Sequence, residues 1–274
     1  MKNILEICSK KLNVTVNKIE YYEGGVSNEN FLINNKYIYR RKKSFSQPFY
    51  SSSCEKEIEE FIKDKNITVP LVYIFSDGTK ITEYVNDAHD LSHTSITNEL
   101  LIKIAKKLKQ LHSYKFKASK DFDPFTRLSY YMESNKNPYR EITDLIVSKM
   151  KKYYENNELV LCHNDLVPGN ILVVNDEIKI IDFEYASNNH PFFDVISFLS
   201  ENNITDPKQI ELFINTYYDN QLPPNIKEMT EDFYNFLDLL WYNWSVMMYY
   251  NLHEPIYYQI CKIKALRLLK LVKE

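Results

Sequence analysis

The sequence has 274 residues, of which 44% are hydrophobic and 26% charged, with a formal net charge of −3, and this suits one two-lobed unit or two small domains. Its lysines are scattered among acidic residues, so it lacks the basic field on which nucleic-acid binding depends. It has no run of 18 apolar residues, which predicts that it does not insert into a membrane. Its four cysteines are widely spaced, which predicts free thiols and a cytoplasmic location.

The chain is predicted to begin with a short amphipathic helix over residues 3–12, followed by two strands within 18–33. Gly24 and Gly25 lie at the turn between these strands, in a chain that has only four glycines. A glycine pair lets the backbone approach phosphate oxygens and offer them N–H donors. Such a pair is more often only a hairpin turn, so both interpretations stay open on the motif alone.

An alternating strand follows at residues 36–41 and ends in cations. A cation on a strand can hold the phosphates of a nucleotide. The run from Arg40 to Lys43 could equally be a solvated strand end.

Residues 54–64 are predicted to form a helix with one apolar face. A glutamate on this helix could orient the strand cation through a charge-assisted pair. We expect Glu55, Glu59 and Glu60 to be surface charges.

Residues 69–75 and 80–85 are predicted to form a hairpin around the turn at Asp77 and Gly78. The second strand ends at Glu83, Tyr84 and Val85, and these residue types give no signature of a ligand held by the backbone.

Residues 98–114 carry apolar side chains at helical spacing and are predicted to form a central core helix. His112 ends this helix, and we assign it no chemistry. The pattern then weakens, because Asp123 and Pro124 interrupt it, and a further helix is expected over 139–155.

Three short apolar strands within residues 159–186 each lead to polar side chains. Asp165 and Asn170 lie in the loop between the first two strands, and Asp182 follows the third. Phosphoryl transfer needs a carboxylate to accept the proton of the attacking hydroxyl, and oxygen ligands to hold Mg²⁺ on the nucleotide phosphates. The alternative is a polar surface hairpin, but the apolar strands on both sides and the second carboxylate favour catalysis.

The chain beyond Pro223 is predicted to be helical and is rich in aromatic residues. Its two tryptophans, Trp241 and Trp244, are three residues apart and share a helix face, which Met248 continues. A stripe of this kind usually belongs to a core. The functional alternative is a set of aromatic faces that bind a quaternary ammonium through cation–π attraction.

The segments HNDLVPGNIL and IDFEYA, which begin at His163 and Ile181, resemble the choline/ethanolamine kinase family. This family is a branch of the protein-kinase-like fold that also includes aminoglycoside phosphotransferases. The resemblance implies an α+β protein with two lobes. The first, over residues 1–85, would be a small antiparallel sheet with one helix that binds the nucleotide. The second, over residues 86–274, would be larger and mostly helical and would carry the catalytic and acceptor-binding residues.

The resemblance also implies that ATP and Mg²⁺ take part in the reaction. It makes Asp165 the catalytic base, and Asn170 and Asp182 the magnesium ligands. Asp194 could brace the catalytic loop, as in the family, or cap the helix that follows, and we interpret it as a cap.

On the nucleotide side, the resemblance assigns a glycine loop, a strand cation, its glutamate partner and a hinge. Glu57 falls in the family's register for the glutamate that orients Arg40. The matching residues in order are Gly25, Ser27, Asn28, Arg40, Glu57, Glu83 and Val85.

On the acceptor side, the family carries a WxxW helix, which favours a pocket at the two tryptophans. The register of the C-terminal pocket tyrosine differs from the family's, so Tyr257 and Tyr258 are both candidates. The aromatic that the family places shortly after its acidic residue is missing here. The predicted pocket residues are Tyr185, Glu201, Trp241, Trp244 and Tyr258.

The resemblance implies an ATP-dependent kinase that phosphorylates the hydroxyl of choline, with Glu201 balancing the cation. Ethanolamine, thiamine and aminoglycosides are alternative acceptors within the superfamily, although polycationic sugars need acidic pockets rather than tryptophan faces. A catalytically inactive kinase-like scaffold is the alternative from another class, and the presence of Asp165 and Asp182 argues against it. The sequence leaves the oligomeric state open.

Overall fold

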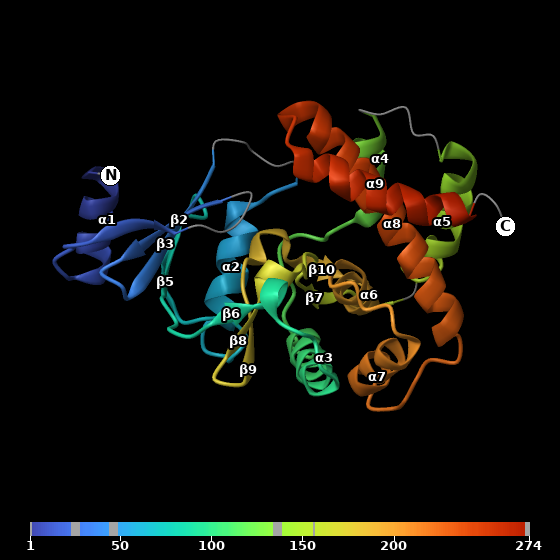
Figure 1. Cartoon of the computed structure of the whole chain (residues 1–274), viewed down its shortest axis with the longest axis horizontal. Coiled ribbons are helices and arrows are strands. Elements are labelled where there is room, and N and C mark those ends of the chain that lie inside the picture. Colours follow the sequence, from blue (N-terminus) through green and yellow to red (C-terminus); the bar gives the residue numbers. More distant parts are fainter. Residues whose placement is uncertain (1, 23–27, 44–48, 134–138, 156, 272–274) are drawn as a thin grey trace.

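The computed structural model describes residues 2–22, 28–43, 49–133, 139–155 and 157–271 (Figure 1). The elements of the N-terminal part are α1 (Lys2–Leu12), β1 (Ile19–Tyr22), β2 (Asn28–Ile33), β3 (Tyr37–Lys42), α2 (Ser52–Ile62), β4 (Leu71–Ile74) and β5 (Lys80–Glu83). The five strands form one antiparallel sheet in the order β1-β2-β3-β5-β4. The prediction of a small antiparallel N-terminal sheet is therefore confirmed.

The described residues form two separate apolar clusters. The smaller cluster joins α1 to the sheet through Ile4, Cys8, Ile33, Tyr39 and Ile81. Helix α2 instead turns its buried apolar side chains towards the main core of the molecule. In Figure 1, α2 lies between the N-terminal sheet and the remaining elements, so its side chains can contact both.

The central elements are β6 (His89–Asp90), η1 (Leu91–His93), α3 (Asn98–His112), α4 (Pro124–Glu133), α5 (Arg140–Lys151), β7 (Val160–Cys162), η2 (Pro168–Asn170), β8 (Ile171–Val174), β9 (Glu177–Ile180), η3 (Phe183–Tyr185) and β10 (Ser187–Asn189). Strands β6, β8 and β9 form one small sheet, and β7 pairs with β10 in another. Helix α3 is the predicted core helix, since its apolar stripe is buried in the main core.

The C-terminal helices are α6 (Pro191–Glu201), α7 (Pro207–Tyr217), α8 (Ile226–Leu252) and α9 (Pro255–Leu271). Helices α8 and α9 pack along each other, and α4, α5 and α6 pack against α8. The sequence analysis missed α4 and α7. Pro124 and Pro207 each occupy the first turn of their helix, where a missing N–H costs nothing, so these prolines begin helices rather than interrupt the chain.

The division of the chain into two lobes near residue 85 stays a prediction.

Within the described residues, none of the helices combines the length and the apolar character that a membrane crossing requires. All four cysteines are free, as predicted, and three of them are buried.

Candidate active site

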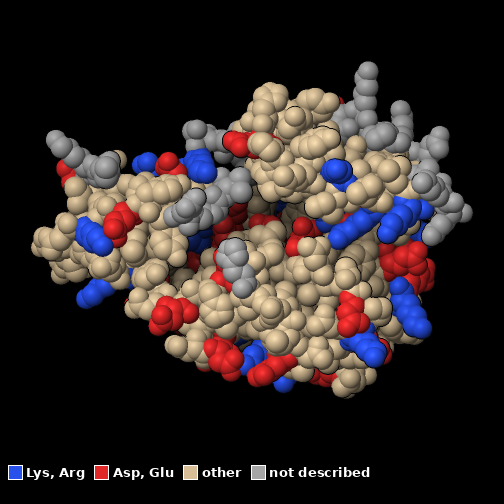
Figure 2. All heavy atoms as spheres, viewed as in Figure 1, with Lys and Arg blue, Asp and Glu red and all other residues tan. Residues whose placement is uncertain are grey.

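Most of the predicted site residues line one cavity of about 730 Å³. It lies between the N-terminal sheet and the C-terminal helices, and Figure 2 shows the hollow with charged side chains inside it. The predicted residues that line it are Asn28, Arg40, Glu83, Val85, Asp165, Asn170, Asp182, Tyr185, Glu201, Trp241 and Trp244. Glu57 and Tyr258 are described but do not line it, and Gly25 and Ser27 lie outside the described residues.

The loop after β7 carries the candidate catalytic base. The side-chain nitrogen of Asn170 donates to the backbone oxygen of Asp165 at 2.9 Å and to its carboxylate at 3.2 Å. These two bonds use the amide nitrogen and leave the carbonyl oxygen of Asn170 available as a ligand. The loop therefore holds the predicted base and one predicted metal ligand in fixed relation to each other.

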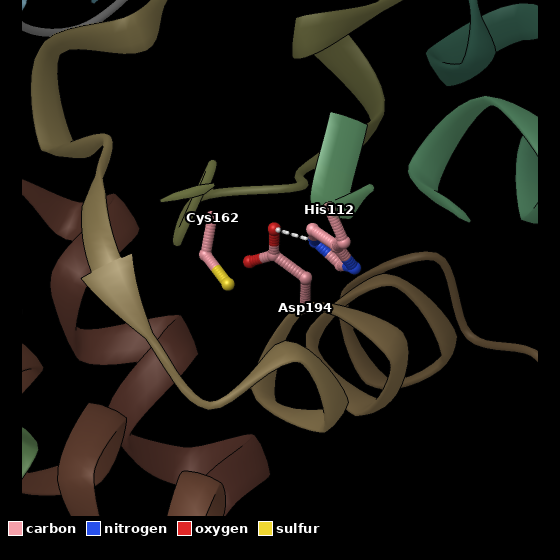
Figure 3. Close-up of side chains that lie close together, drawn as sticks. All are labelled: His112, Cys162 and Asp194. Carbon is pink, nitrogen blue, oxygen red and sulfur yellow. Dashed lines mark hydrogen bonds and ion pairs between the residues drawn. The ribbon is translucent and has the colours of Figure 1, made fainter. Parts of the chain in front are cut away.

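Asp194, fully buried on α6, braces this loop. Its two carboxylate oxygens accept hydrogen bonds from the backbone N–H groups of His163, at 2.7 Å, and Asn164, at 2.8 Å. The Nε2 atom of His112 lies 3.1 Å from the same carboxylate (Figure 3). His190 is the N-cap of α6, so the interpretation of Asp194 as a cap is wrong. Asp194 lies inside the helix, where its side chain reaches across to the loop.

The group of His112, Cys162 and Asp194 has potential metal-binding atoms within 4.8 Å of one another. Both Asp194 oxygens already accept hydrogen bonds, however, and this reduces their use as ligands. Burial, with the nearby Asp194 charge, raises the pKa of the Cys162 thiol well above its usual value, so the thiol stays protonated. We interpret the group as support for the catalytic loop.

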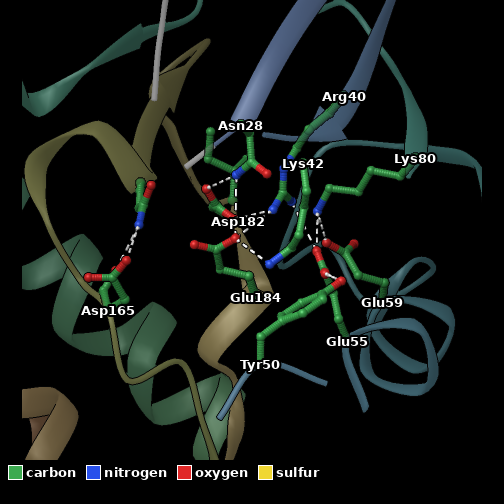
Figure 4. Close-up of polar contacts among 12 residues, drawn as sticks. Asn28, Arg40, Lys42, Tyr50, Glu55, Glu59, Lys80, Asp165, Asp182 and Glu184 are labelled. Carbon is green, nitrogen blue, oxygen red and sulfur yellow. Dashed lines mark hydrogen bonds and ion pairs between the residues drawn. The ribbon is translucent and has the colours of Figure 1, made fainter. Parts of the chain in front are cut away.

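The candidate metal ligand Asp182 follows β9 with a left-handed backbone, at φ 69°. Non-glycine residues seldom adopt this conformation, and where they do the site is often functional. Its carboxylate faces the guanidinium of Arg40, with Oδ1 at 2.8 Å from Nη2 (Figure 4).

Arg40 on β3 is the centre of a buried charge network and is only 7% exposed. Its Nη1 lies 3.0 Å from Glu55, and its Nη2 lies 3.2 Å from Glu184. The Asn28 amide, oriented with its oxygen towards the guanidinium, accepts hydrogen bonds from Nη2 at 2.9 Å and from Nε at 3.0 Å. Arg40 thus links β3, α2 and the segment after β9, which belong to distant parts of the sequence.

The structure corrects the assignment of the glutamates on α2. Glu55, not Glu57, is the partner of Arg40, and the Glu57 carboxylate instead accepts a hydrogen bond from the backbone of Ser119 at 2.5 Å. The expectation that Glu55 and Glu59 are surface charges is also wrong, since each is 1% exposed. Both form ion pairs with Lys80 of β5, which lies opposite Arg40 in the β3–β5 register.

The charges in this network set the protonation of its carboxyls. Burial disfavours the ionised form of Asp182, but the charges of Arg40 and Lys80 outweigh it and lower the pKa. Burial raises the pKa of Glu184, and the neighbouring Asp182 charge adds to that shift. Asp182 is therefore the carboxylate that keeps its negative charge, as a metal ligand must.

Asp165 has the opposite electrostatic environment. Burial raises its pKa to about 8, and the negative charges of Asp182, Glu184 and Glu201 add to the effect. A carboxyl whose pKa is near neutrality is suited to exchange a proton with a substrate hydroxyl.

The residues predicted to bind the acceptor bring aromatic side chains to the cavity. Trp241 and Trp244 have ring centroids 5.8 Å apart in an edge-to-face arrangement, and Trp244 has the same kind of contact with Tyr257 at 5.5 Å. Tyr257 lines the cavity and is 3% exposed, whereas the side chain of Tyr258 is 57% exposed. The prediction of Tyr258 as a pocket residue is therefore wrong. Consecutive residues of α9 point in different directions, and Tyr257 is the one on the inner face.

Glu201 lies at the end of α6 and lines this part of the cavity. Its carboxylate is 2.7 Å from the ammonium of the buried Lys264 on α9. One turn earlier on α6, the hydroxyl of Ser197 lines the cavity and has no hydrogen-bond partner among the described residues. The sequence analysis predicted Glu201 but gave no sign of Lys264.

The family model for choline/ethanolamine kinases matches residues 19–264. The protein LicA of Haemophilus influenzae is 26% identical over 212 residues, which cover 72% of this chain and 62% of LicA. The chain thus spans about three fifths of the length of this relative.

Among solved structures, the choline kinase LicA from Streptococcus pneumoniae superposes with a TM-score of 0.82 at 24% identity, over 98% of both chains. LicA in complex with AMP superposes with a TM-score of 0.79, also at 24% identity and over 98% of both chains. These likenesses confirm the predicted kinase-like fold. Since the family model covers most of the sequence, the chain belongs to the choline/ethanolamine kinase family.

Proposed function

We propose that this chain is an ATP-dependent kinase that transfers the γ-phosphoryl group to the hydroxyl of choline. The observation that carries the proposal is that Asp165, Asn170 and Asp182 line the same cavity as Trp241 and Trp244. Family membership supports a phosphotransferase that acts on an alcohol. The AMP bound by the structurally similar LicA supports an adenine nucleotide.

The residues present fit a magnesium site. Asp182 keeps its charge and Asn170 keeps a free carbonyl oxygen, and these hard oxygen donors are the ligands that Mg²⁺ prefers. When bound, Mg²⁺ neutralises charge on the nucleotide phosphates. On the protein side, Arg40 provides a fixed guanidinium for phosphate oxygens, and its contacts with Glu55 and Asn28 hold it in place.

Asp165 would accept the proton of the choline hydroxyl and direct its oxygen towards the γ-phosphate. Its pKa of about 8 means that much of it is protonated at neutral pH. A bound choline cation adds positive charge near Asp165 and so favours the carboxylate form. The acceptor would thus help to prepare its own base.

The acceptor site suits a quaternary ammonium. A trimethylammonium group has no hydrogen-bond donor, and it binds to aromatic faces through cation–π attraction and apolar contact. Trp241, Trp244, Tyr185 and Tyr257 provide such surfaces along the cavity. The tryptophan faces favour such a group over a polycationic sugar, whose many N–H donors need carboxylates rather than aromatic rings. A reaction that uses ATP also supports the proposed cytoplasmic location.

A coupled assay of ADP release across choline, ethanolamine, thiamine and an aminoglycoside tests the proposal. We expect the highest kcat/KM with choline. Asp165→Asn should remove nearly all turnover while nucleotide binding persists, because the variant keeps Arg40 and Asp182. Full activity of Asp165→Asn would refute the assigned base, and nucleotide binding without transfer to any acceptor would favour an inactive kinase-like scaffold.

A further inference from the structure

A buried lysine lies directly behind the acceptor site. Lys264 on α9 is 3% exposed, and its ammonium is 2.7 Å from Glu201, 3.3 Å from Asp238 and 3.2 Å from the hydroxyl of Ser200. A lysine is seldom buried this completely unless its charge is paired. It therefore ties the end of α6 to α8 and α9.

The carboxylates of this cluster differ in what else they bind. Arg267 contacts Asp238 at 3.2 Å and Ser200 at 2.9 Å, so Asp238 has a second cation. Among the described residues, Lys264 is the cation paired with Glu201. Removal of the Lys264 charge would therefore release Glu201 while Asp238 keeps a partner.

The two members of the pair face different surroundings. Glu201 lines the cavity, with its side chain 22% exposed, whereas Lys264 does not line the cavity and its side chain is 4% exposed. A ligand at the aromatic end thus meets a carboxylate whose charge is already compensated from behind, with one oxygen occupied. An ammonium ligand is attracted by Glu201 and repelled by Lys264.

This compensation affects primary and quaternary ammonium groups differently. A primary ammonium has three N–H donors and gains most from a free carboxylate, because hydrogen bonds to a charged group are the strong ones. A trimethylammonium group has no donor and loses little when that carboxylate is occupied. The hydroxyl of Ser197 remains as an acceptor for a primary ammonium, but it is neutral and so the weaker partner.

We propose that Lys264 is a positioning residue that sets acceptor specificity: by holding and neutralising Glu201, it makes the site select quaternary over primary amino alcohols. This inference rests on the proposed function. It assigns the preference for choline over ethanolamine to a residue outside the cavity, in addition to the tryptophan faces.

The test measures kcat and KM for choline, N,N-dimethylethanolamine, N-methylethanolamine and ethanolamine, whose ammonium groups have zero, one, two and three N–H donors. For the wild type, we expect kcat/KM to fall along this series. For Lys264→Met, the ratio of choline to ethanolamine kcat/KM should fall by about tenfold, which corresponds to roughly 1.4 kcal/mol. The change should lie in the KM for ethanolamine, with the KM for ATP unchanged.

Two variants serve as controls. Lys264→Arg keeps the charge beside Glu201 and should keep the wild-type ratio. Lys262→Met makes the same substitution at an exposed position of the same helix and should change nothing. Lys264→Gln removes the charge but keeps hydrogen-bond donors, and it replaces Lys264→Met if that variant does not fold; its ratio should also fall.

The outcomes separate this inference from the proposed function. A folded Lys264→Met or Lys264→Gln variant with the wild-type ratio overturns the role of Lys264 and leaves the kinase intact. A wild type that prefers ethanolamine overturns it as well, without any variant. Absence of transfer to all four alcohols would instead overturn the proposed function.

Discussion

Asp165→Asn should stabilise the nucleotide-free protein, by an amount that grows with pH. The pKa of Asp165 is about 8 in the folded chain and about 4 in an unfolded one. Between these values the folded state holds a proton that the unfolded state has released, so ionisation costs stability progressively as pH rises from about 4 to about 8. Asparagine has the same shape and does not titrate, so the variant avoids this loss.

The size of the effect follows from the shift. About four pKa units correspond to roughly 5 kcal/mol for a group closed off from water. The Asp165 side chain faces an open cavity, so solvent reduces the effect, and we expect about 2 kcal/mol at pH 8. For a chain of this size, that is a rise in Tm of about 4 to 8 °C, with little difference near pH 5.

Thermal unfolding of wild type and variant between pH 5 and 8, without nucleotide or metal, measures this difference. Asp176→Asn is the matched control, because it makes the same substitution at a side chain that is 81% exposed in the β8–β9 turn, where it removes a surface ion pair with Lys103. An Asp165→Asn variant that is less stable than wild type at pH 8, or equally stable at every pH, would refute the argument. Burial and the neighbouring carboxylates would then not disfavour the ionised form of Asp165 in the folded protein.

Three further predictions concern the aromatic surface of the cavity, the Arg40 network and the turn at Gly78. Trp244→Ala should raise the KM for choline by about tenfold and leave the KM for ATP within about twofold, since it removes a cation–π surface; equal changes in both would make the tryptophan a core residue only. Glu55→Gln should raise the KM for ATP and lower the Tm, because it removes a buried partner of the β3 guanidinium, whereas the matched Glu57→Gln should do neither. Gly78→Ala should destabilise the fold by about 1 to 2 kcal/mol, because φ is 85° and the added Cβ would collide with the Tyr50 hydroxyl. In urea unfolding, Tyr50→Phe should recover part of that loss, and strict additivity of the two changes would contradict the collision.

The central part of the site was predictable because its signal is local. Asp165 and Asn170 lie in the loop between two short apolar strands and Asp182 follows the third, and all three line the same cavity. The wrong predictions concern residues whose position depends on which face of a helix is buried. Glu55 shares a buried face with Ile58 and Ile62, at spacings of three and seven residues, whereas Glu57 lies well off that face. Helical periodicity could have identified Glu55, and register with the family pointed away from it.

Helix α9 gave no such signal, and this explains the error at Tyr258. Apolar side chains surround the helix, and several of them, including Ile263 and Leu266, are more than half exposed. Its inner face contains the buried cation Lys264 beside Tyr257 and Leu268, although a lysine is usually exposed. A helix with apolar residues outside and a charge inside can be oriented only from its contacts with α6 and α8.

The buried cations also offset the repulsion among the many carboxylates of the site. Three cations form ion pairs with four carboxylates beside β3, so the two kinds of charge nearly balance. The cations are Arg40, Lys42 and Lys80, and the carboxylates are Glu55, Glu59, Asp182 and Glu184. Arg40, the guanidinium proposed to hold phosphates, is paired with the proposed metal ligand Asp182. A nucleotide that enters with its metal would therefore replace an ion pair already present. The free-energy cost of removing Arg40 and Asp182 from water is incurred during folding and not on binding. This arrangement makes the site preorganised for phosphate, at a cost in stability that the wider network of pairs offsets.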